Sequence, residues 1–174
     1  AAGLLVAVGV AGAGQMATMR AWLDRQFPVT GMAVATDLRH EDPQALAHWL
    51  AERLQGGFFT ADLGRLQRAL QKRPWVREAR LRRRWPGELV VTVTEHHPVA
   101  RWRQGSEAGW RLVSEEGAVF RPEETAVAGL PRLEGPRARL EELRGRLTEL
   151  EERLGADHHV SGVRVDARGD WTAR

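Results

Sequence analysis

The sequence predicts an α+β protein in which an N-terminal transmembrane helix precedes a β-α-α-β-β unit and then a mostly antiparallel β domain with one long helix. Three features predict this fold. Residues 1–19 carry no charged side chain. Apolar residues alternate with polar ones on both sides of Pro86-Gly87-Glu88, which indicates a β-hairpin. Leucines recur at intervals of three or four between residues 137 and 154, which is typical of an amphipathic helix.

Length and composition set the limits of the fold. The chain has 174 residues, which suffices for one medium domain or two small ones, and its formal charge is only +3. It contains no cysteine, so disulfides and thiolate metal sites are excluded. Lys72 is the only lysine, and arginine is favoured where contacts are bidentate or stacked. Because the chain starts at Ala1 without methionine and ends soon after a turn-like segment, we expect a fragment of a longer protein.

The uncharged N-terminal segment has the length of a membrane span. A stretch of about 20 apolar residues, rising about 1.5 Å per residue, crosses the hydrocarbon core of a bilayer. We therefore predict the distal part of a transmembrane helix at residues 1–23, with Trp22 at the interfacial level where amphipathic rings collect. A signal peptide with a small-residue cleavage site near residues 11–13 is an alternative.

A glycine pattern in the same segment supports a second alternative. Gly12 and Gly14 follow a possible strand, as in a dinucleotide-binding loop, and Asp37 stands about where a ribose-binding acid belongs. The protein would then be a nicotinamide-dependent oxidoreductase. Nothing after Asp37 repeats the strand-helix-strand units that a parallel sheet needs, which favours the membrane helix.

The β-α-α-β-β unit begins with a predicted strand at Phe27–Val34. A helix from Pro43 to about Gln55 follows, with Asp42 as its N-cap. A second helix is predicted from Thr60, as its N-cap, to the residue before Pro74. The hairpin closes the unit. Its predicted core consists of Trp49, Leu50, Leu66, Leu70, Ala79, Leu81, Leu89 and Val91.

A second unit starts near Ala100. Trp110 and Leu112 occupy alternate positions of a predicted strand, and Val119-Phe120 would form a strand that runs back beside it. This segment is therefore predicted to be another hairpin. Residues 130–136 are predicted to be a rigid loop, and residues 137–154 a helix whose leucines form one seam. With only two or three heptads, packing of this seam on the sheet is favoured over a coiled coil. A strand with Val163, Val165 and Ala167 follows, and Trp171 begins another.

The stretch 74–102, with Pro74-Trp75-Val76 at its start and Trp85-Pro86 and Glu95 within it, resembles the FtsQ/DivIB family of bacterial cell-division proteins. Further motifs follow the family's order over essentially the whole chain. These are Phe27-Pro28, Leu38-Arg39-His40, Phe58-Phe59-Thr60, Pro98-Val99-Ala100-Arg101-Trp102, Glu116-Gly117-Ala118-Val119-Phe120, Leu130-Pro131, Gly135-Pro136, Arg168 and Trp171. The ordered set is specific, although no single motif is.

The resemblance implies a bitopic protein of the cell inner membrane, with its bulk in the periplasm at the division septum. Residues 27–98 would be a POTRA domain, and residues 99–174 a β domain that is incomplete at its C-terminus. The family is a divisome scaffold that links early and late division proteins, among them FtsB, FtsL and the septal peptidoglycan machinery. The resemblance implies no catalysis, cofactor, metal or nucleic acid. Thr36 stands where the family usually has a glycine after the first strand.

Three candidate interaction residues lie in the hairpin. Arg82 and Trp85 belong to a basic run that suits a solvated strand face, a protein-binding face, or a nucleic-acid or lipid contact. The first is favoured because alternation splits the run and acidic residues adjoin it. Glu95 matches a family acid. It is either a charged contact that helps recruit divisome partners or an ordinary surface carboxylate.

Two more candidates lie near the C-terminus. An unpaired strand edge near residues 163–174 is expected to accept a strand from another chain, with Arg168 and Trp171 near the contact. Alternatively, Trp171 packs on Val163 and Val165 inside the domain.

Two other interpretations are less favoured. His96-His97 and His158-His159 suggest a metal site, but adjacent strand residues point to opposite faces and cannot both bind one ion. The β-α-α-β-β unit also suits a POTRA module of an outer-membrane assembly or secretion protein, which predicts tandem copies. One copy is visible in the sequence.

Overall fold

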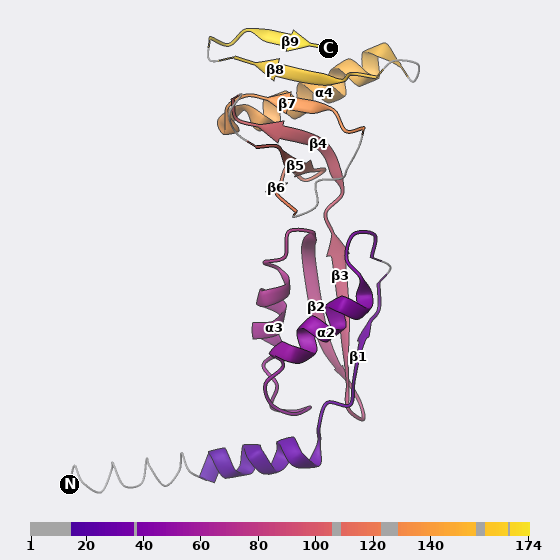
Figure 1. The fold of residues 1–174 in the computed structure, drawn as a ribbon, viewed down its shortest axis with the longest axis vertical. Helices are drawn as coiled ribbons and strands as arrows, with labels where there is room; N and C mark the ends of the chain where they lie inside the picture. The colour runs from indigo at the N-terminus through magenta and orange to yellow at the C-terminus, as the bar shows by residue number, and fades with distance from the viewer. Residues whose placement is uncertain (1–14, 37, 106–108, 123–128, 156–158, 167) are drawn as a thin grey trace, which may run out of the picture. The chain divides into compact units, whose positions relative to one another are not determined.

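The computed structural model describes residues 15–36, 38–105, 109–122, 129–155, 159–166 and 168–174 (Figure 1). They form two compact units, Ala1–Glu95 and His96–Arg174, each described here by itself. In the first unit, residues 15–26 are helical. Five further elements follow in the order β1 (Gly31–Val34), α2 (Pro43–Arg53), α3 (Leu63–Leu70), β2 (Val76–Arg84) and β3 (Glu88–Glu95). The predicted β-α-α-β-β order is confirmed, and the described residues hold one copy of it.

The first unit is organised around β3, the central strand of a sheet with the order β1-β3-β2. β3 pairs in parallel with β1 and antiparallel with β2. Helices α2 and α3 both pack on this sheet through a shared apolar core (Figure 1). The buried residues of that core are Leu46, Leu50, Leu66, Leu70, Val76, Ala79, Val91 and Val93, with Trp49 and Leu81 partly buried against it.

Two boundaries differ from the sequence prediction. β1 starts at Gly31 and not at Phe27, because the Phe27 N–H still donates to Leu23 O (2.8 Å) in helical fashion and Pro28 has no N–H to give. The N-cap of α3 is Asp62, whose carboxylate accepts from the Arg65 N–H. Thr60, which sequence analysis assigned as this cap, instead accepts the Gly57 N–H (2.9 Å) with its hydroxyl oxygen.

The bend after β1 is made without glycine. Thr36 occupies this place, and its hydroxyl oxygen accepts the Val93 N–H at 3.3 Å. No non-glycine residue in the described ranges has a positive φ, so the bend needs no left-handed backbone. The Thr36 side chain thus continues the contact with β3 after the strand ends.

The second unit contains one mixed sheet of β4 (Pro98–Arg103), β5 (Arg111–Ser114), β6 (Val119–Phe120), β7 (Arg132–Glu134), β8 (Gly162–Val165) and β9 (Trp171–Ala173). The strand order is β6-β5-β4-β7-β8-β9. The pairs β4–β5, β5–β6 and β8–β9 are antiparallel, in line with a mostly antiparallel domain, and β5–β6 is the predicted hairpin. β7 pairs in parallel with both β4 and β8. The prediction that residues 130–136 form only a rigid loop is therefore wrong at residues 132–134.

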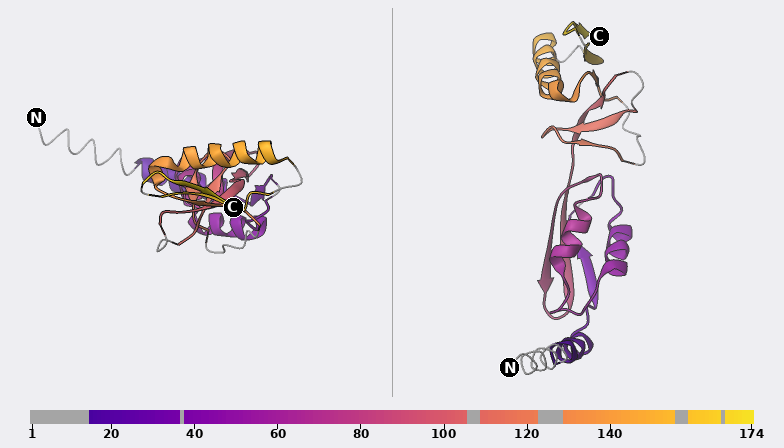
Figure 2. Two further views of the ribbon diagram at one scale, coloured as in Figure 1. Left: turned by 90° about the horizontal axis from the view of Figure 1, so that it is seen from above. Right: turned by 90° about the vertical axis from the view of Figure 1, so that its left-hand side faces the viewer.

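A 3₁₀ turn (Arg137–Arg139) and α4 (Leu140–Leu154) cover one face of the second sheet (Figure 2). The leucine seam packs as predicted: Leu140, Leu143 and Leu147 are buried against strand residues such as Leu133. Leu154, the last of the seam, is exposed. The helix thus forms one side of the second core, packs on one face of the sheet and leaves the opposite face uncovered by it.

The predicted membrane helix falls largely outside the described residues, because residues 1–14 are not among them. Within the described part of the chain, no helix combines the length and apolarity that crossing a bilayer requires. Gly12, Gly14 and Asp37, the residues of the alternative cofactor site, also lie outside the described ranges.

The core of the first unit makes a direct prediction. Leu66 is 3% and Leu70 0% exposed. Truncation of either to alanine should lower the free energy of unfolding by about 2–5 kcal/mol, because each leaves a cavity between helix and sheet. Urea denaturation followed by circular dichroism measures the change.

Leu154→Ala is the control, since this leucine is 47% exposed. We expect its effect to stay within about 0.5 kcal/mol. A loss at Leu66 and Leu70 no larger than that of the control would mean that the helix faces are assigned incorrectly.

Candidate functional site

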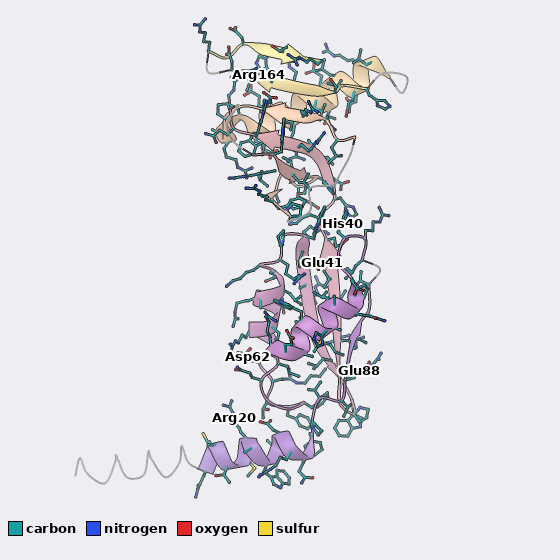
Figure 3. The ribbon with its side chains drawn as sticks, in the orientation of Figure 1. Arg20, His40, Glu41, Asp62, Glu88 and Arg164 are labelled. Carbon is teal, nitrogen blue, oxygen red and sulfur yellow. The ribbon has the colours of Figure 1, made fainter. Side chains whose placement is uncertain are left out.

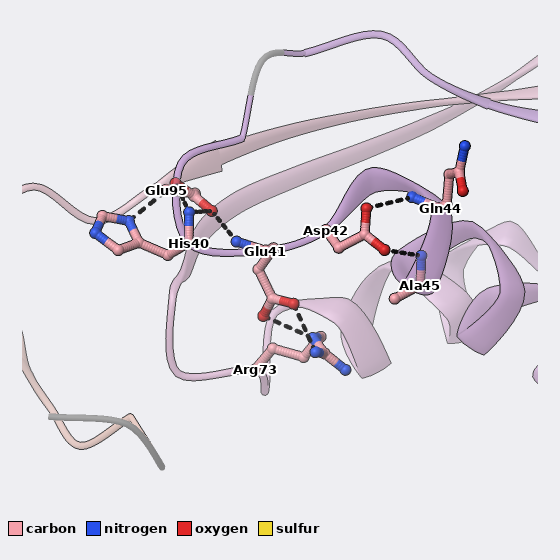
Figure 4. Close-up of polar contacts among 7 residues, drawn as sticks. All are labelled: His40, Glu41, Asp42, Gln44, Ala45, Arg73 and Glu95. Atoms are coloured by element: carbon pink, nitrogen blue, oxygen red, sulfur yellow. Dashed lines mark hydrogen bonds and ion pairs between the residues drawn. The ribbon is translucent and has the colours of Figure 1, made fainter. Parts of the chain in front are cut away.

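Glu95, the last residue of β3, is buried and holds the loop between β1 and α2 (Figure 4). Its carboxylate accepts hydrogen bonds from the backbone N–H groups of Arg39 (3.0 Å), His40 (3.2 Å) and Glu41 (3.0 Å). The Nδ1 atom of His40 lies 3.2 Å from the same carboxylate. Consecutive N–H groups form a concave anion site, and bonds to a carboxylate are stronger than those between neutral groups. Glu95 therefore fixes the path of the loop.

The loop is fastened a second time by Glu41. Both oxygens of its carboxylate accept from the Arg73 guanidinium, at 2.9 and 2.6 Å (Figure 4). The Arg73 guanidinium also lies 5.2 Å above the Trp49 ring of α2. On the other side, the His40 ring stacks on Trp75 with a centroid distance of 3.7 Å. We call this arrangement the loop clamp and define it as Glu95, residues 39–41, Arg73 and Trp75.

The loop clamp lies at one end of the first sheet, and a cluster of aromatic rings lies at the other. Figure 3 shows His40 and Glu41 where β3 ends and Glu88 where it begins. Trp85, in the turn between β2 and β3, contacts three phenylalanine rings with centroid distances of 5.9–6.3 Å. We call the cluster of Phe27, Phe58, Phe59 and Trp85 the aromatic tip.

The backbone beneath the aromatic tip is held by Arg83. Its guanidinium donates to the carbonyl oxygens of Phe58, Phe59 (3.2 Å) and Ala61 (2.7 Å). These carbonyls belong to the connector between α2 and α3, so an arginine on β2 ties this connector to the sheet. Ala61 O also accepts the Leu63 N–H at 3.1 Å.

Asp24 attaches the N-terminal helical segment to the same connector. Its carboxylate accepts from the Gly57 N–H at 2.8 Å and from the Thr60 hydroxyl. The bond from Thr60, followed by that from Gly57, lowers the pKa of the Asp24 carboxyl. Only glycine fits here, because a Cβ at Gly57 would lie 2.7 Å from Phe27 O and 2.8 Å from the Asp24 Cα. We call the contact of Asp24 with Gly57 and Thr60 the helix latch.

In the second unit, β9 is the last strand of the sheet. Gly162 and Arg174 exchange both backbone hydrogen bonds, at 3.3 and 3.0 Å. Because such pairs alternate along an antiparallel ladder, the N–H groups of Trp171 and Ala173 point away from β8. No strand pairs with that side of β9 within the described residues.

Trp171 itself is half-buried against the second core. The guanidinium groups of Arg139 and Arg146 lie 5.1 and 5.7 Å from its ring. Arg168 is exposed in the turn before β9, where its N–H donates to Asp166 (2.8 Å). Bonds from the N–H of Asp170 and then of Arg168 lower the pKa of the Asp166 carboxyl.

The structure places the five predicted interaction residues in different environments. Arg82, within β2, and Trp85, at the start of the β2–β3 turn, are both exposed, Trp85 by 65%. Glu95 lies at the far end of β3 and is 9% exposed, so its carboxylate is used within the unit. Arg168 and Trp171 belong to the other unit. A role of these residues in binding partners stays a prediction.

The residues that complete the loop clamp and the helix latch could not be found from the sequence. Asp24, Glu41 and Arg73 were not singled out, because no local pattern links them to partners more than 30 positions away. The loop clamp and the helix latch both hold segments of the backbone in place. Within the described ranges, no group of three or more His, Cys, Asp or Glu side chains is arranged to hold a metal ion.

Comparison with known proteins gives consistent matches. Residues 27–96 match the family model of the POTRA domain, FtsQ-type, and residues 100–174 match that of the cell division protein FtsQ/DivIB, C-terminal. Three relatives, each named cell division protein FtsQ, cover 97% of the chain. They come from Allochromatium vinosum (36% identical), Xanthomonas campestris (33%) and a Thioalkalivibrio species (37%). The chain spans 66%, 60% and 70% of their lengths, respectively.

The loop clamp predicts the effect of removing Glu95. In Glu95→Ala, the N–H groups of residues 39–41 lose a common buried acceptor, so the first unit should be destabilised by about 1–3 kcal/mol. Amide hydrogen exchange at these three positions should accelerate, which nuclear magnetic resonance can measure residue by residue.

Glu78→Ala serves as the matched control, because Glu78 is on the same sheet but pairs with Arg80 at the surface, with its side chain 44% exposed. Exposed pairs contribute at most about 1 kcal/mol. If a folded Glu95→Ala variant exchanged these amides as slowly as the control does, the clamp assignment would be incorrect.

Proposed function

The chain belongs to the FtsQ/DivIB family of cell division proteins, and on this premise we propose that it is a bitopic inner-membrane scaffold of the divisome. It links early and late division proteins through periplasmic protein–protein contacts during septum formation. The observation that carries this proposal is that both family models match in order, one on each compact unit.

The character of the described side chains supports a scaffold. The most buried acid, Glu95, is consumed by backbone contacts, and the Glu41–Arg73 pair is bidentate and internal. Scaffolds need stable units with recognisable surfaces, and here each unit is a sheet with helices on it. Residues 1–19, which carry no charge, would anchor the chain in the membrane.

The edge of β9 that has no partner strand in the described residues supports partner binding by strand addition. Its outward N–H groups, at Trp171 and Ala173, can pair with a strand of another chain, and we assign this mode of binding to FtsB. Arg168 offers charge-assisted bonds beside it. FtsL and the septal peptidoglycan machinery would join through the same assembly.

Topology provides the first test. A reporter enzyme that is active only in the periplasm should work when fused after Arg174, because residues 1–19 would anchor the chain with its bulk outside the cytoplasm. The matched control is a reporter that is active only in the cytoplasm, fused at the same position. Activity of the control fusion, with none from the first, would contradict the proposal.

The β9 edge provides the second test, a pull-down of the chain with the periplasmic part of FtsB. Ala173→Pro removes an outward donor without breaking a bond to β8, so binding should weaken. Trp171→Ala should weaken binding tenfold or more, about 1.4 kcal/mol, if the ring also contacts the partner.

Trp110→Ala is the control, since Trp110 is another half-buried tryptophan of this unit, 4.5 Å from the Arg103 guanidinium. Circular dichroism checks that each variant is folded. Undiminished FtsB binding by folded Ala173→Pro would rule out strand addition at this edge. If only Trp171→Ala unfolds, the ring serves core packing.

A further inference from the structure

The face of the second sheet that α4 leaves uncovered carries a hollow of about 590 Å³, to which β4, β7, β8 and β9 all contribute. The opposite face of the sheet packs on α4 through Trp102, Leu133 and Val163, which are register partners in neighbouring strands (Figure 2). Successive residues of a strand point to opposite faces. The residues just before and after these three therefore point toward the hollow.

One row of residues across this face carries positive charge. Arg101 of β4 is the register partner of Arg132 of β7, whose partner on the other side is Gly162 of β8. Arg174, after β9, exchanges backbone hydrogen bonds with Gly162. We call these four residues the arginine row. All of them line the hollow, and none of the three arginines makes an ion pair within the described residues.

The next row on the same face is balanced, which shows what the arginine row lacks. Glu134 lies between two arginines, with its carboxylate 2.8 Å from Arg103 and 3.9 Å from Arg164. In the arginine row, by contrast, Arg101 and Arg132 are direct neighbours, and like charges placed opposite each other destabilise a sheet. The Nε atom of Arg101 is also buried without a hydrogen-bond partner in the described part of the chain, and such buried polar atoms are rare. An anion bound from outside would relieve both conditions.

Gly162 keeps a gap in the row. A Cβ at this position would lie 2.6 Å from Arg132 O, so no side chain fits between Arg132 and Arg174. Neighbouring strands lie about 4.8 Å apart, which separates the backbones of these two arginines by about 10 Å. Residues three positions apart in an extended peptide are also separated by about 10 Å. The spacing therefore suits two carboxylates at such positions.

The rest of the lining indicates which kind of anion fits. Leu130 and Pro131, both half-buried, line the hollow together with the arginines. Asp166 and Asp170 line it as well, and they would repel a chain with a negative charge on every unit, such as a nucleic acid. A peptide supplies separate carboxylates, which match the guanidinium fork, and also apolar side chains. The occupant favoured by this lining is an acidic peptide.

We propose that the arginine row is a docking site for an acidic segment of a partner protein, bound in an extended conformation with acidic residues three positions apart. One carboxylate lies between Arg101 and Arg132, and the next lies at Arg174. Apolar side chains of the segment contact Leu130 and Pro131. This site uses side chains on a face of the sheet, whereas strand addition uses the outward N–H groups of β9, so the inference does not depend on the proposed FtsB contact.

The test measures binding of a labelled peptide, Glu-Leu-Ser-Glu-Leu-Ser with blocked ends, by fluorescence anisotropy. A second peptide has glutamine in place of glutamate. The full chain is kept in a neutral detergent, and circular dichroism checks the folding of each variant. Arg101→Gln, Arg132→Gln and Arg174→Gln each remove one charge from the row. Arg153→Gln is the matched control, because it removes the same charge from α4, where this side chain is 74% exposed.

We expect the glutamate peptide to bind the wild-type chain, with weaker binding at high salt, and the glutamine peptide not to bind. Each folded variant of the row should weaken binding by about fivefold or more, which corresponds to about 1 kcal/mol. The control should stay within about twofold of the wild type. Because three positions of the row are tested, one variant that fails to fold leaves the test decisive.

Failure of the glutamate peptide to bind the folded wild-type chain, or an equal loss in Arg153→Gln, would overturn the inference. Displacement by pyrophosphate as effective as displacement by unlabelled peptide would identify a small-anion site instead. Loss of binding in folded Ala173→Pro would place the peptide at the edge of β9 and overturn the arginine row. Normal binding by that variant would support the row and separate it from the FtsB contact.

Discussion

The arrangement of the first unit depends on a buried carboxylate, that of Glu95. Burying an unpaired charge costs several kcal/mol, and the cost is offset here by hydrogen bonds from three consecutive backbone N–H groups. Those bonds set the course of residues 39–41, which in turn place Asp42 as the N-cap of α2 and direct Glu41 to Arg73. The position of a helix, the bidentate ion pair and the stacked His40 ring thus follow from one acceptor at the end of the central strand.

Several arginine side chains make contacts that a lysine in their place could not make. Arg73 combines a bidentate bond to Glu41 with a ring contact to Trp49, and Arg83 spans backbone carbonyls of one connector. In the second unit, arginines lie over the rings of Trp102, Trp110 and Trp171. A planar guanidinium can stack and donate several bonds at once, whereas an ammonium is a compact point charge. Within each unit, these arginines therefore make contacts that a lysine in the same place could not make.

The sequence was sufficient for elements that carry their own periodic pattern. Asp42-Pro43 marks the start of α2, alternation outlines β2 and β3, and the leucine seam outlines α4. The sequence was insufficient for β7. This strand has three residues, of which only Leu133 is buried, so it shows no alternating pattern, and its partner strands on both sides come from distant segments. The same limit applies to the sites. Glu95 stood out in the sequence, but its partners near residue 40 could not be identified, since nothing local encodes a contact 55 positions away.

The placement of β3 determines when the first unit can fold. β1 has only β3 as a neighbour, pairing Gly31 with Glu88, and β2 also pairs only with β3. At roughly 5–20 residues per second, ribosomes complete β3 several seconds after β1. Until then β1 has no partner strand, and the apolar faces of α2 and α3 have no complete sheet to cover. The sheet and the core of the unit therefore cannot be complete before Glu95 has emerged.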